Sequence, residues 1–157
     1  MSDVEKRLAE LGLAVPTVVA PVGSYTPAKR DGRLVYTSGQ LPMVDGALAG
    51  SGKVGEGDGL VAPEQAAELA RTCALNAIAA VKSVIGDLDQ VESVVKVVGF
   101  VASDPSFTKQ PAVVNGASDL LAAAFGDAGV HTRSAVGVAV LPMDAPVEVE
   151  IVVSVRE

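Results

Sequence analysis

The residues best suited to chemistry lie near the C-terminus, where an arginine precedes one apolar run and two glutamates lie in the next. Arg133 comes directly before the apolar segment 134–141, and Glu148 and Glu150 alternate with apolar residues in segment 147–155. A guanidinium keeps its charge in a protein and presents a planar fork of donors that matches a carboxylate. Arg133 therefore predicts either an ion pair with Glu148 or Glu150 on a neighbouring strand, or bidentate capture of a small substrate's carboxylate.

Glu148 and Glu150 are two positions apart in a run that alternates with valine and isoleucine. Because successive strand side chains point to opposite faces, both acids share one face of the predicted strand and the alternating apolar residues share the other. If those apolar residues face the helices, the two acids line the opposite, interface-facing surface. A carboxylate held there beside Arg133 can orient a water molecule or move a proton. The alternative is an exposed polar sheet face.

Ser38, Gly39 and Gln40 close another predicted strand and place a hydroxyl, a flexible backbone position and an amide at one point. Glycine lets a ligand approach the backbone closely, which predicts a binding position. The alternative is a simple turn that ends the strand. Tyr25 follows a Gly-Ser pair between two strand segments, and its pattern fits either core packing or contact with a ligand.

The remaining reactive residue types argue against several mechanisms. His131 is the only histidine and Cys73 the only cysteine, and they lie far apart in the chain, so no metal site is predicted. We assign His131 to loop structure and Cys73 to the buried face of a helix. The chain has no Walker A phosphate-binding loop, no Gly-x-Gly-x-x-Gly after a strand and no Gly-x-Ser-x-Gly elbow. Neither a nucleotide cofactor nor serine hydrolysis is therefore predicted.

Length and composition predict one domain. The chain has 157 residues, of which 49% are hydrophobic, enough to bury a core without metal or disulfide bonds. A net charge of −7 and an aromatic content of 3% argue against a nucleic-acid-binding surface, because such surfaces cluster Lys and Arg and stack bases on aromatic rings. The chain start lacks a signal-peptide pattern and no apolar run reaches about 18 residues, so we expect a cytoplasmic protein without membrane contact.

Glycine, proline and hydrophobic spacing divide the chain into expected elements. A helix over 3–11 begins with a capping box formed by Ser2 and Glu5. The other expected elements are strands at 17–20 and 34–38 with a hairpin turn at 30–33 between them, a mobile surface loop at 43–59, a long helix at 63–85, a strand at 94–102, a helix from 106 or 111 to 125, and strands at 134–141 and 147–155. Two long helices cover only one face of such a sheet, which predicts an α+β sandwich. The uncovered face still carries apolar residues and predicts a symmetric oligomer that hides it.

An ordered set of short motifs resembles the Rid family of reactive intermediate deaminases, also called the YjgF or liver perchloric-acid-soluble protein (L-PSP) family. The motifs are Gly23-Ser24-Tyr25, Tyr36 to Pro42, Asn76, Val101 to Phe107, Asn115, and Arg133-Ser134 through Leu141-Pro142 to Glu148. The resemblance covers about residues 17–156. It implies a single domain over 1–157, in which 1–16 is an added N-terminal helical extension and 17–157 is the Rid-like domain.

The resemblance implies a chorismate-mutase-like, ferredoxin-like fold, with a mixed sheet and two long helices on one face, assembled as a homotrimer with clefts between subunits. It also implies cofactor-free hydrolysis of enamine and imine acids, such as 2-aminoacrylate and its imine tautomer, to 2-keto acids and ammonia. On the family pattern Arg133 binds the substrate carboxylate, Glu148 positions the attacking water, and Tyr25, Ser38 and Gly39 shape the cleft. The alternatives are a noncatalytic trimer that binds small carboxylates or a partner in this cleft, and the endoribonuclease label that parts of the family carry.

Several positions depart from the family pattern. Ala135, at a substrate-binding position, replaces the cysteine that many deaminating members carry, and His131 and Thr132 replace a Pro-Ala pair before the arginine. Ser24 replaces a proline, and the glycine-rich loop at 43–59 is longer. These departures predict a divergent branch whose substrate differs, while Arg133 keeps deamination in place.

Overall fold

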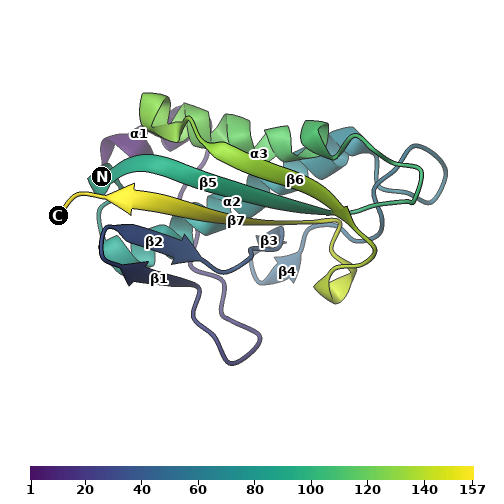
Figure 1. Ribbon diagram of the computed structural model, residues 1–157, viewed down its shortest axis with the longest axis horizontal. Coiled ribbons are helices and arrows are strands. Elements are labelled where there is room, and N and C mark those ends of the chain that lie inside the picture. The colour runs from purple at the N-terminus through teal and green to yellow at the C-terminus, as the bar shows by residue number, and fades with distance from the viewer.

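A five-stranded mixed sheet carries two long helices on one of its faces in the computed structural model, which describes residues 1–157 (Figure 1). The elements in chain order are α1 (Asp3–Glu10), β1 (Ala28–Asp31), β2 (Leu34–Thr37), β3 (Met43–Val44), β4 (Ala47–Leu48), α2 (Pro63–Ile85), β5 (Val91–Ala102), α3 (Gln110–Phe125), β6 (Thr132–Val138) and β7 (Val147–Val155). The strand order is β1-β2-β7-β5-β6, and only β5 and β6 pair in parallel. The predicted α+β sandwich is confirmed.

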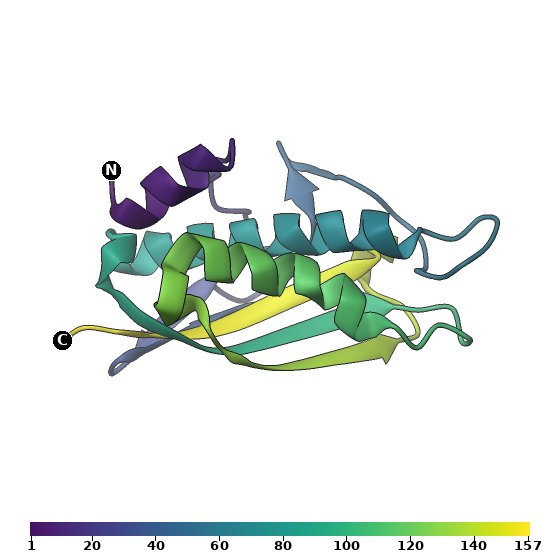
Figure 2. The ribbon, with the colours of Figure 1, turned by 90° about the horizontal axis from the view of Figure 1, so that it is seen from above.

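The two long helices lie side by side over the sheet, as the second view shows (Figure 2). Helix α2 begins with Pro63 in its first turn and ends at Gly86, whose φ of 80° suits glycine. Gly116 of α3 meets the backbone of α2 so closely that a Cβ there would lie 1.9 Å from the carbonyl oxygen of Ala67. The absence of a side chain at this position therefore sets the distance between the two helices.

Strand β7 separates the two faces of the sheet. Its apolar residues Val147, Val149, Ile151, Val153 and Val155 are buried beneath the helices. The alternate residues point to the open face, which no other element of the chain covers (Figure 2). On that face Tyr36 and Val136 are 46% and 45% exposed. The open face is thus partly apolar, as the sequence predicts.

The N-terminal helix α1 is fixed to the body of the molecule at both its cap and its buried face. Ser2 and Glu5 form the predicted capping box, and the carboxylate of Asp89 accepts hydrogen bonds from the first backbone amides of the helix. Leu8 is fully buried, and Lys82 of α2 pairs with Glu5. Together with the Ser2 hydrogen bonds, that lysine lowers the pKa of Glu5 to about 2.

Two expectations about the first third of the chain are wrong, whereas the hairpin turn predicted at 30–33 is confirmed. Residues 17–20 form no strand, and the hairpin through the Asp-Gly turn instead pairs β1 with β2. The apolar run at 17–20 is only partly covered and lacks a neighbouring strand edge. The segment 43–59 is not a structureless loop, because it contains the β3–β4 hairpin and the fully buried Val54, whose backbone pairs with that of Ala102 and Asp104.

The later boundaries differ by a few residues from those predicted. The strand expected at 94–102 begins at Val91, and the helix after it begins at Gln110. The strand expected at 134–141 is β6 and ends at Val138, so the last apolar residues before Pro142 lie outside the sheet. None of the helices combines the length and the apolarity needed to cross a membrane.

Candidate active site

Arg133 lies on the edge strand β6 and points to the helix side of the sheet. Its register partner on β5 is Val97, which is fully buried in the core. The guanidinium donates to the Asn115 side chain at 2.8 Å, to Ser118 Oγ at 3.2 Å and to the carbonyl oxygen of Pro111 at 3.2 Å, all on helix α3. The ion pair with Glu148 or Glu150 that the sequence leaves open is therefore excluded within one chain, since β5 separates the strands and the side chains use opposite faces.

The contacts of Arg133 leave part of its guanidinium available for a ligand. A guanidinium has five N–H donors. Both Nη1 hydrogens and one Nη2 hydrogen serve the three contacts with α3. The Nε–H and the second Nη2–H have no partner in the chain, which is the number of donors that a bidentate carboxylate needs. The side chain is half-buried and its orientation is fixed by the helix.

A short chain of hydrogen bonds that runs through His131 and Ser118 fixes the position of the Arg133 guanidinium. His131 Nδ1 lies 2.6 Å from the carbonyl oxygen of Gly129, which can only accept, so Nδ1 carries a proton, and in this tautomer of the imidazole Nε2 is an acceptor. Ser118 Oγ lies 2.8 Å from Nε2 and donates to it, and the same oxygen accepts from Arg133. The assignment of His131 to loop structure is thus incomplete, because its ring also sets the orientation of the Ser118 hydroxyl.

Glu148 lies on the open face of the sheet, beside Phe100 of β5 in register. Its carboxyl group is packed against the backbone of Gly39, where an added Cβ would lie 2.7 Å from Cδ and 3.0 Å from Oε1. Partial burial, and then the negative charge of Glu150, raise the pKa of Glu148. No side-chain hydrogen bond holds the carboxylate, so a water molecule or substrate can take that place. A half-buried acid with a raised pKa suits proton transfer.

Gly39 connects Glu148 to a cavity of about 800 Å³ that Tyr25 also lines. The Tyr25 hydroxyl accepts a hydrogen bond from the Val22 amide at 3.3 Å, and 49% of the residue is exposed. Ser38 Oγ donates to the carbonyl oxygen of Thr26 at 2.7 Å, which ties the end of β2 to the segment that carries Tyr25. Gly39 and Gln40 line the cavity, and Gly39 also contacts Glu148.

The predicted site residues fall into two groups within one chain. Tyr25, Ser38, Gly39 and Glu148 lie together where β2 ends beside β7. Arg133 and Ala135 lie on the helix side of β6, beyond β5, and Ala135 packs partly against the core in register with Gly99. We call the first group the Glu148 half-site and the second the Arg133 half-site. A single chain does not bring the two half-sites together.

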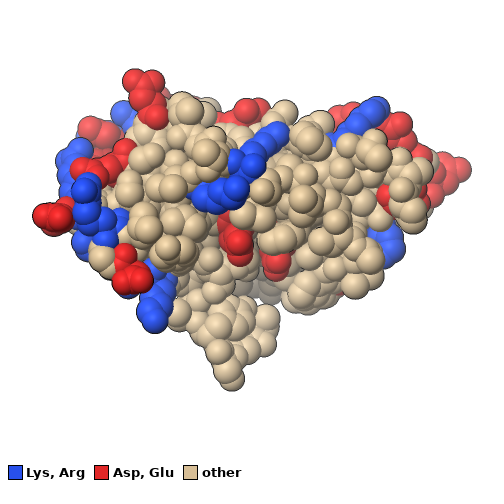
Figure 3. All heavy atoms as spheres, viewed as in Figure 1, with Lys and Arg blue, Asp and Glu red and all other residues tan.

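Charged side chains are visible on the open face of the sheet. The space-filling view of the open face has basic atoms across its upper part and two acidic side chains near its middle, above a hollow (Figure 3). Glu148 and Glu150 are the acids that β7 directs to this face.

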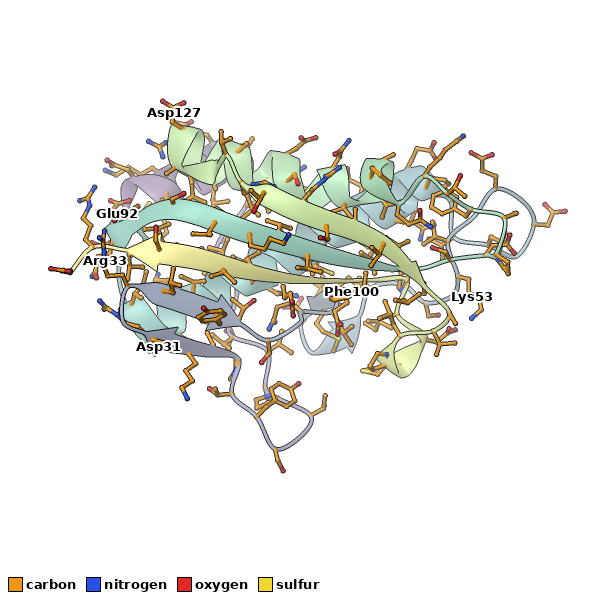
Figure 4. The ribbon with its side chains drawn as sticks, viewed as in Figure 1. Asp31, Arg33, Lys53, Glu92, Phe100 and Asp127 are labelled. Carbon is orange, nitrogen blue, oxygen red and sulfur yellow. The ribbon has the colours of Figure 1, made fainter.

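The labelled side chains mark positions along the sheet (Figure 4). Arg33 and Glu92 form an ion pair at the end of the sheet near the C-terminus, and Phe100 lies farther along it.

Ser118 and the walls of the cavity are the parts of the site that sequence reasoning missed. Ser118 lies three residues after Asn115 on a predicted helix, so both face the same way, and this spacing was the available signal. The cavity is built partly from an irregular segment, for which no periodic pattern exists. Cys73 is fully buried, and burial raises the pKa of its thiol well above the usual value, so it is not a nucleophile. No three His, Cys, Asp or Glu side chains gather into a metal-binding group.

Comparisons with known proteins agree with this architecture. Residues 5–154 match the family model described as "YjgF/chorismate mutase-like, putative endoribonuclease". Protein TCP17 of Trypanosoma cruzi is 43% identical over 98% of this chain and 94% of its own length. The crystal structure of Atu1372 from Agrobacterium tumefaciens, of unknown function, is 42% identical and covers 98% of this chain and 93% of that one with a TM-score of 0.91. The YjgF gene product of E. coli is 25% identical over 90% of this chain and 94% of its own, with a TM-score of 0.65.

Proposed function

This chain belongs to the YjgF/chorismate mutase-like family, and from that premise we propose that it hydrolyses reactive 2-imino and enamine acids to 2-keto acids and ammonia in the cytoplasm. The observation that carries the proposal is the pair of half-sites. The Glu148 half-site offers a carboxylate without a hydrogen-bond partner beside the backbone of Gly39. The Arg133 half-site offers a guanidinium with two N–H donors that no residue of the chain occupies. Carboxylate capture and proton transfer are the two tasks that this hydrolysis requires.

The half-sites meet only if two copies of the chain are joined. The Arg133 half-site is on edge strand β6, whereas the Glu148 half-site is at the other side of the sheet near β2. In the arrangement that we propose, three subunits form a ring with their open faces toward one another, and β6 of one copy lies beside β2 and β7 of the next. We therefore propose a homotrimer with three intersubunit sites, in which each subunit contributes Arg133 to one site and Glu148 to another.

The chemistry then needs no cofactor and no covalent intermediate, because the carbon of an iminium group is already electrophilic. Arg133 holds the substrate carboxylate. Glu148 takes one proton from a water molecule as its oxygen bonds to the carbon and the π electrons of the C=N bond move to nitrogen. The proton then passes from Glu148 to nitrogen, and the C–N bond breaks as the C=O bond of the keto acid forms. The carboxylate of Glu148 takes the hydroxyl proton and passes it to the departing ammonia, which leaves as ammonium. An enamine first takes a proton at its β-carbon and becomes the imine.

The test uses imino acids generated in place by an amino acid oxidase, with semicarbazide to trap the imine that has not been hydrolysed. We expect the wild type to accelerate keto acid release and the variants Arg133→Ala and Glu148→Gln to be nearly inactive. Co-expression of the two variants with different tags should restore activity in the mixed oligomers. Random trimers have both intact residues at about one quarter of their sites.

Each outcome of this test has a distinct meaning. If the wild type is no faster than Arg133→Ala, the proposed deaminase activity is wrong. Saturable binding of keto acids without turnover would instead identify a noncatalytic carboxylate-binding protein. Cleavage of RNA by the wild type, lost in Glu148→Gln, would favour an endoribonuclease. If the two variants stay inactive when they are co-expressed, the site does not lie between subunits. The proposed reaction would then still be judged by comparing wild type with each single variant.

A further inference from the structure

The cavity beside Gly39 is larger than the smallest imino acids need. It has a volume of about 800 Å³ and lies between the irregular segment 13–22, the β3–β4 turn and helix α2. Its apolar lining includes Leu13, Val18, Val22, Met43 and Leu75. In Figure 3 the surface is hollowed between the loop that hangs below β1 and the body of the molecule. Imines of alanine or dehydroalanine carry a single carbon beyond the imine carbon, which would leave this space unused.

The cavity adjoins the Glu148 half-site, because Tyr25 and Gly39 of that half-site line it. Gly39 lines the cavity, and the carboxyl group of Glu148 packs against the same residue. Tyr25 forms another part of the wall. Glu148 itself does not line the cavity, so a substrate whose imine carbon lies at Glu148 would reach the cavity past Gly39 and Tyr25, which border both.

The residues that line the cavity favour an apolar substrate side chain over a charged one. No lysine or arginine lines the cavity, and its acidic residue, Asp45, is exposed on the β3–β4 turn with a φ of 50°. A carboxylate inside would lose its hydration without a cation to replace it. In segment 13–22, Val18 and Val19 are half-buried outside the core cluster, and Val22 is 82% exposed. A hydrocarbon chain that covers them is stabilised by about 25 cal/mol for each Å² of apolar surface buried.

We infer that the cavity binds the side chain of the substrate, and that the substrates of this site are 2-imino acids with a large apolar side chain. This inference rests on the proposed function and adds the substrate class to it. The carboxylate remains on Arg133 of a neighbouring subunit, the imine carbon lies at Glu148, and the side chain extends along α2. Imines of leucine, methionine and phenylalanine fit this description, whereas imines of aspartate and glutamate do not.

The experiment compares kcat/KM for imines formed in place from alanine, leucine, phenylalanine and glutamate. Burial of three more carbons predicts an increase on the order of tenfold to a hundredfold from the alanine to the leucine imine. The glutamate imine should fall below the alanine imine. Equal kcat/KM for the alanine and leucine imines would overturn the inference and leave the deaminase intact. Absence of turnover with every imine would instead overturn the proposed function.

A pair of matched variants on α2 separates the cavity from a general effect on the helix. Thr72 lines the cavity and its hydroxyl donates to the carbonyl oxygen of Glu68, whereas Ser83 is exposed outside it and donates to that of Ala80. Thr72→Phe should remove the preference for the leucine imine, measured as the ratio of kcat/KM for the leucine imine to that for the alanine imine. Ser83→Phe should leave this ratio unchanged. A preference that survives Thr72→Phe would contradict the inference.

Direct binding gives a second readout that needs no turnover. Calorimetry with the stable keto acids should show 4-methyl-2-oxopentanoate binding at least about tenfold more tightly than pyruvate. Thr72→Phe should abolish that difference. If a neighbouring copy of the chain fills the cavity instead, the two keto acids should bind equally, and the inference fails even if the protein is a deaminase.

Discussion

The two half-sites are built in opposite ways. Arg133 is fixed by three hydrogen bonds to helix α3, and Ser118 among its partners is itself oriented by His131. Glu148 has no hydrogen-bond partner and is placed only by its strand and by contact with the Gly39 backbone. The Arg133 half-site is a hydrogen-bonded polar network with two donors left free, whereas the Glu148 half-site holds a half-buried acid with a raised pKa.

The difference corresponds to the task that we propose for each half-site. A residue that binds a carboxylate gains from a fixed orientation, because less conformational freedom is lost when the ligand arrives. A residue that accepts and returns a proton gains from a pKa closer to neutrality and from open hydrogen-bonding positions for water. Changes at the two half-sites should therefore affect different kinetic constants.

The largest expected effect is that of Glu148→Gln, which keeps the shape of the side chain and removes the proton acceptor. We expect kcat to fall by about 10²- to 10⁴-fold with little change in KM. The raised pKa of Glu148 also means that its ionisation destabilises the fold at pH values above that pKa. The variant should therefore have a higher Tm than wild type at neutral pH, and this difference should shrink as the pH falls through the raised pKa of Glu148 and vanish below its ordinary value of 4.5.

Glu150→Gln is the matched control, because Glu150 shares the strand and the face and contributes to the raised pKa of Glu148. Wild-type activity requires the ionised carboxylate, so the rate should fall on the acid side as Glu148 becomes protonated. Removing the charge of Glu150 should move this acid limb to lower pH and otherwise keep kcat within about threefold. A Glu148→Gln variant with the wild-type kcat would assign the proton transfer to another group.

The sequence predicts the long regular elements well. Helix α2 and strand β7 have the predicted boundaries, because their hydrophobic positions repeat with the period of a helix and of a strand over many residues. The open face of the sheet follows from the count of long helices. The α1 capping box is likewise read from the local pattern of Ser2 and Glu5.

What the sequence could not predict depends on contacts between distant segments. Residues 17–20 have the composition of a strand, yet they pair with no strand, because the hairpin partner of β2 is β1 and the other neighbour of β2 is β7. The separation of Arg133 from Glu148 depends on the insertion of β5 between their strands, a matter of strand order that periodicity does not encode. Burial of Val54 also depends on distant partners at Ala102 and Asp104.

Gly39→Ala should have the second-largest effect, and it tests how Glu148 is placed. The added Cβ would lie 2.7 Å from Cδ and 3.0 Å from Cγ of Glu148, so the carboxyl group must move. A shift of this size in a reacting group predicts a loss in kcat of about 10- to 100-fold. The combination of Gly39→Ala with Glu148→Gln should be no worse than Glu148→Gln alone, because both changes act through one carboxylate. Additive losses would show that Gly39 acts on the substrate directly.

The smallest expected effect is that of Ser118→Ala, because it removes one of three supports of Arg133 and leaves the charge in place. Loss of one hydrogen bond of about 0.5 to 1.5 kcal/mol predicts a rise in KM of about three- to tenfold. The kcat should stay nearly constant, since Glu148 lies in the other half-site. Ser118→Thr keeps the hydroxyl that links His131 to Arg133 and should restore KM. If Ser118→Ala lowered kcat and left KM unchanged, Arg133 would act on the reacting atoms and the division of tasks between the half-sites would be wrong.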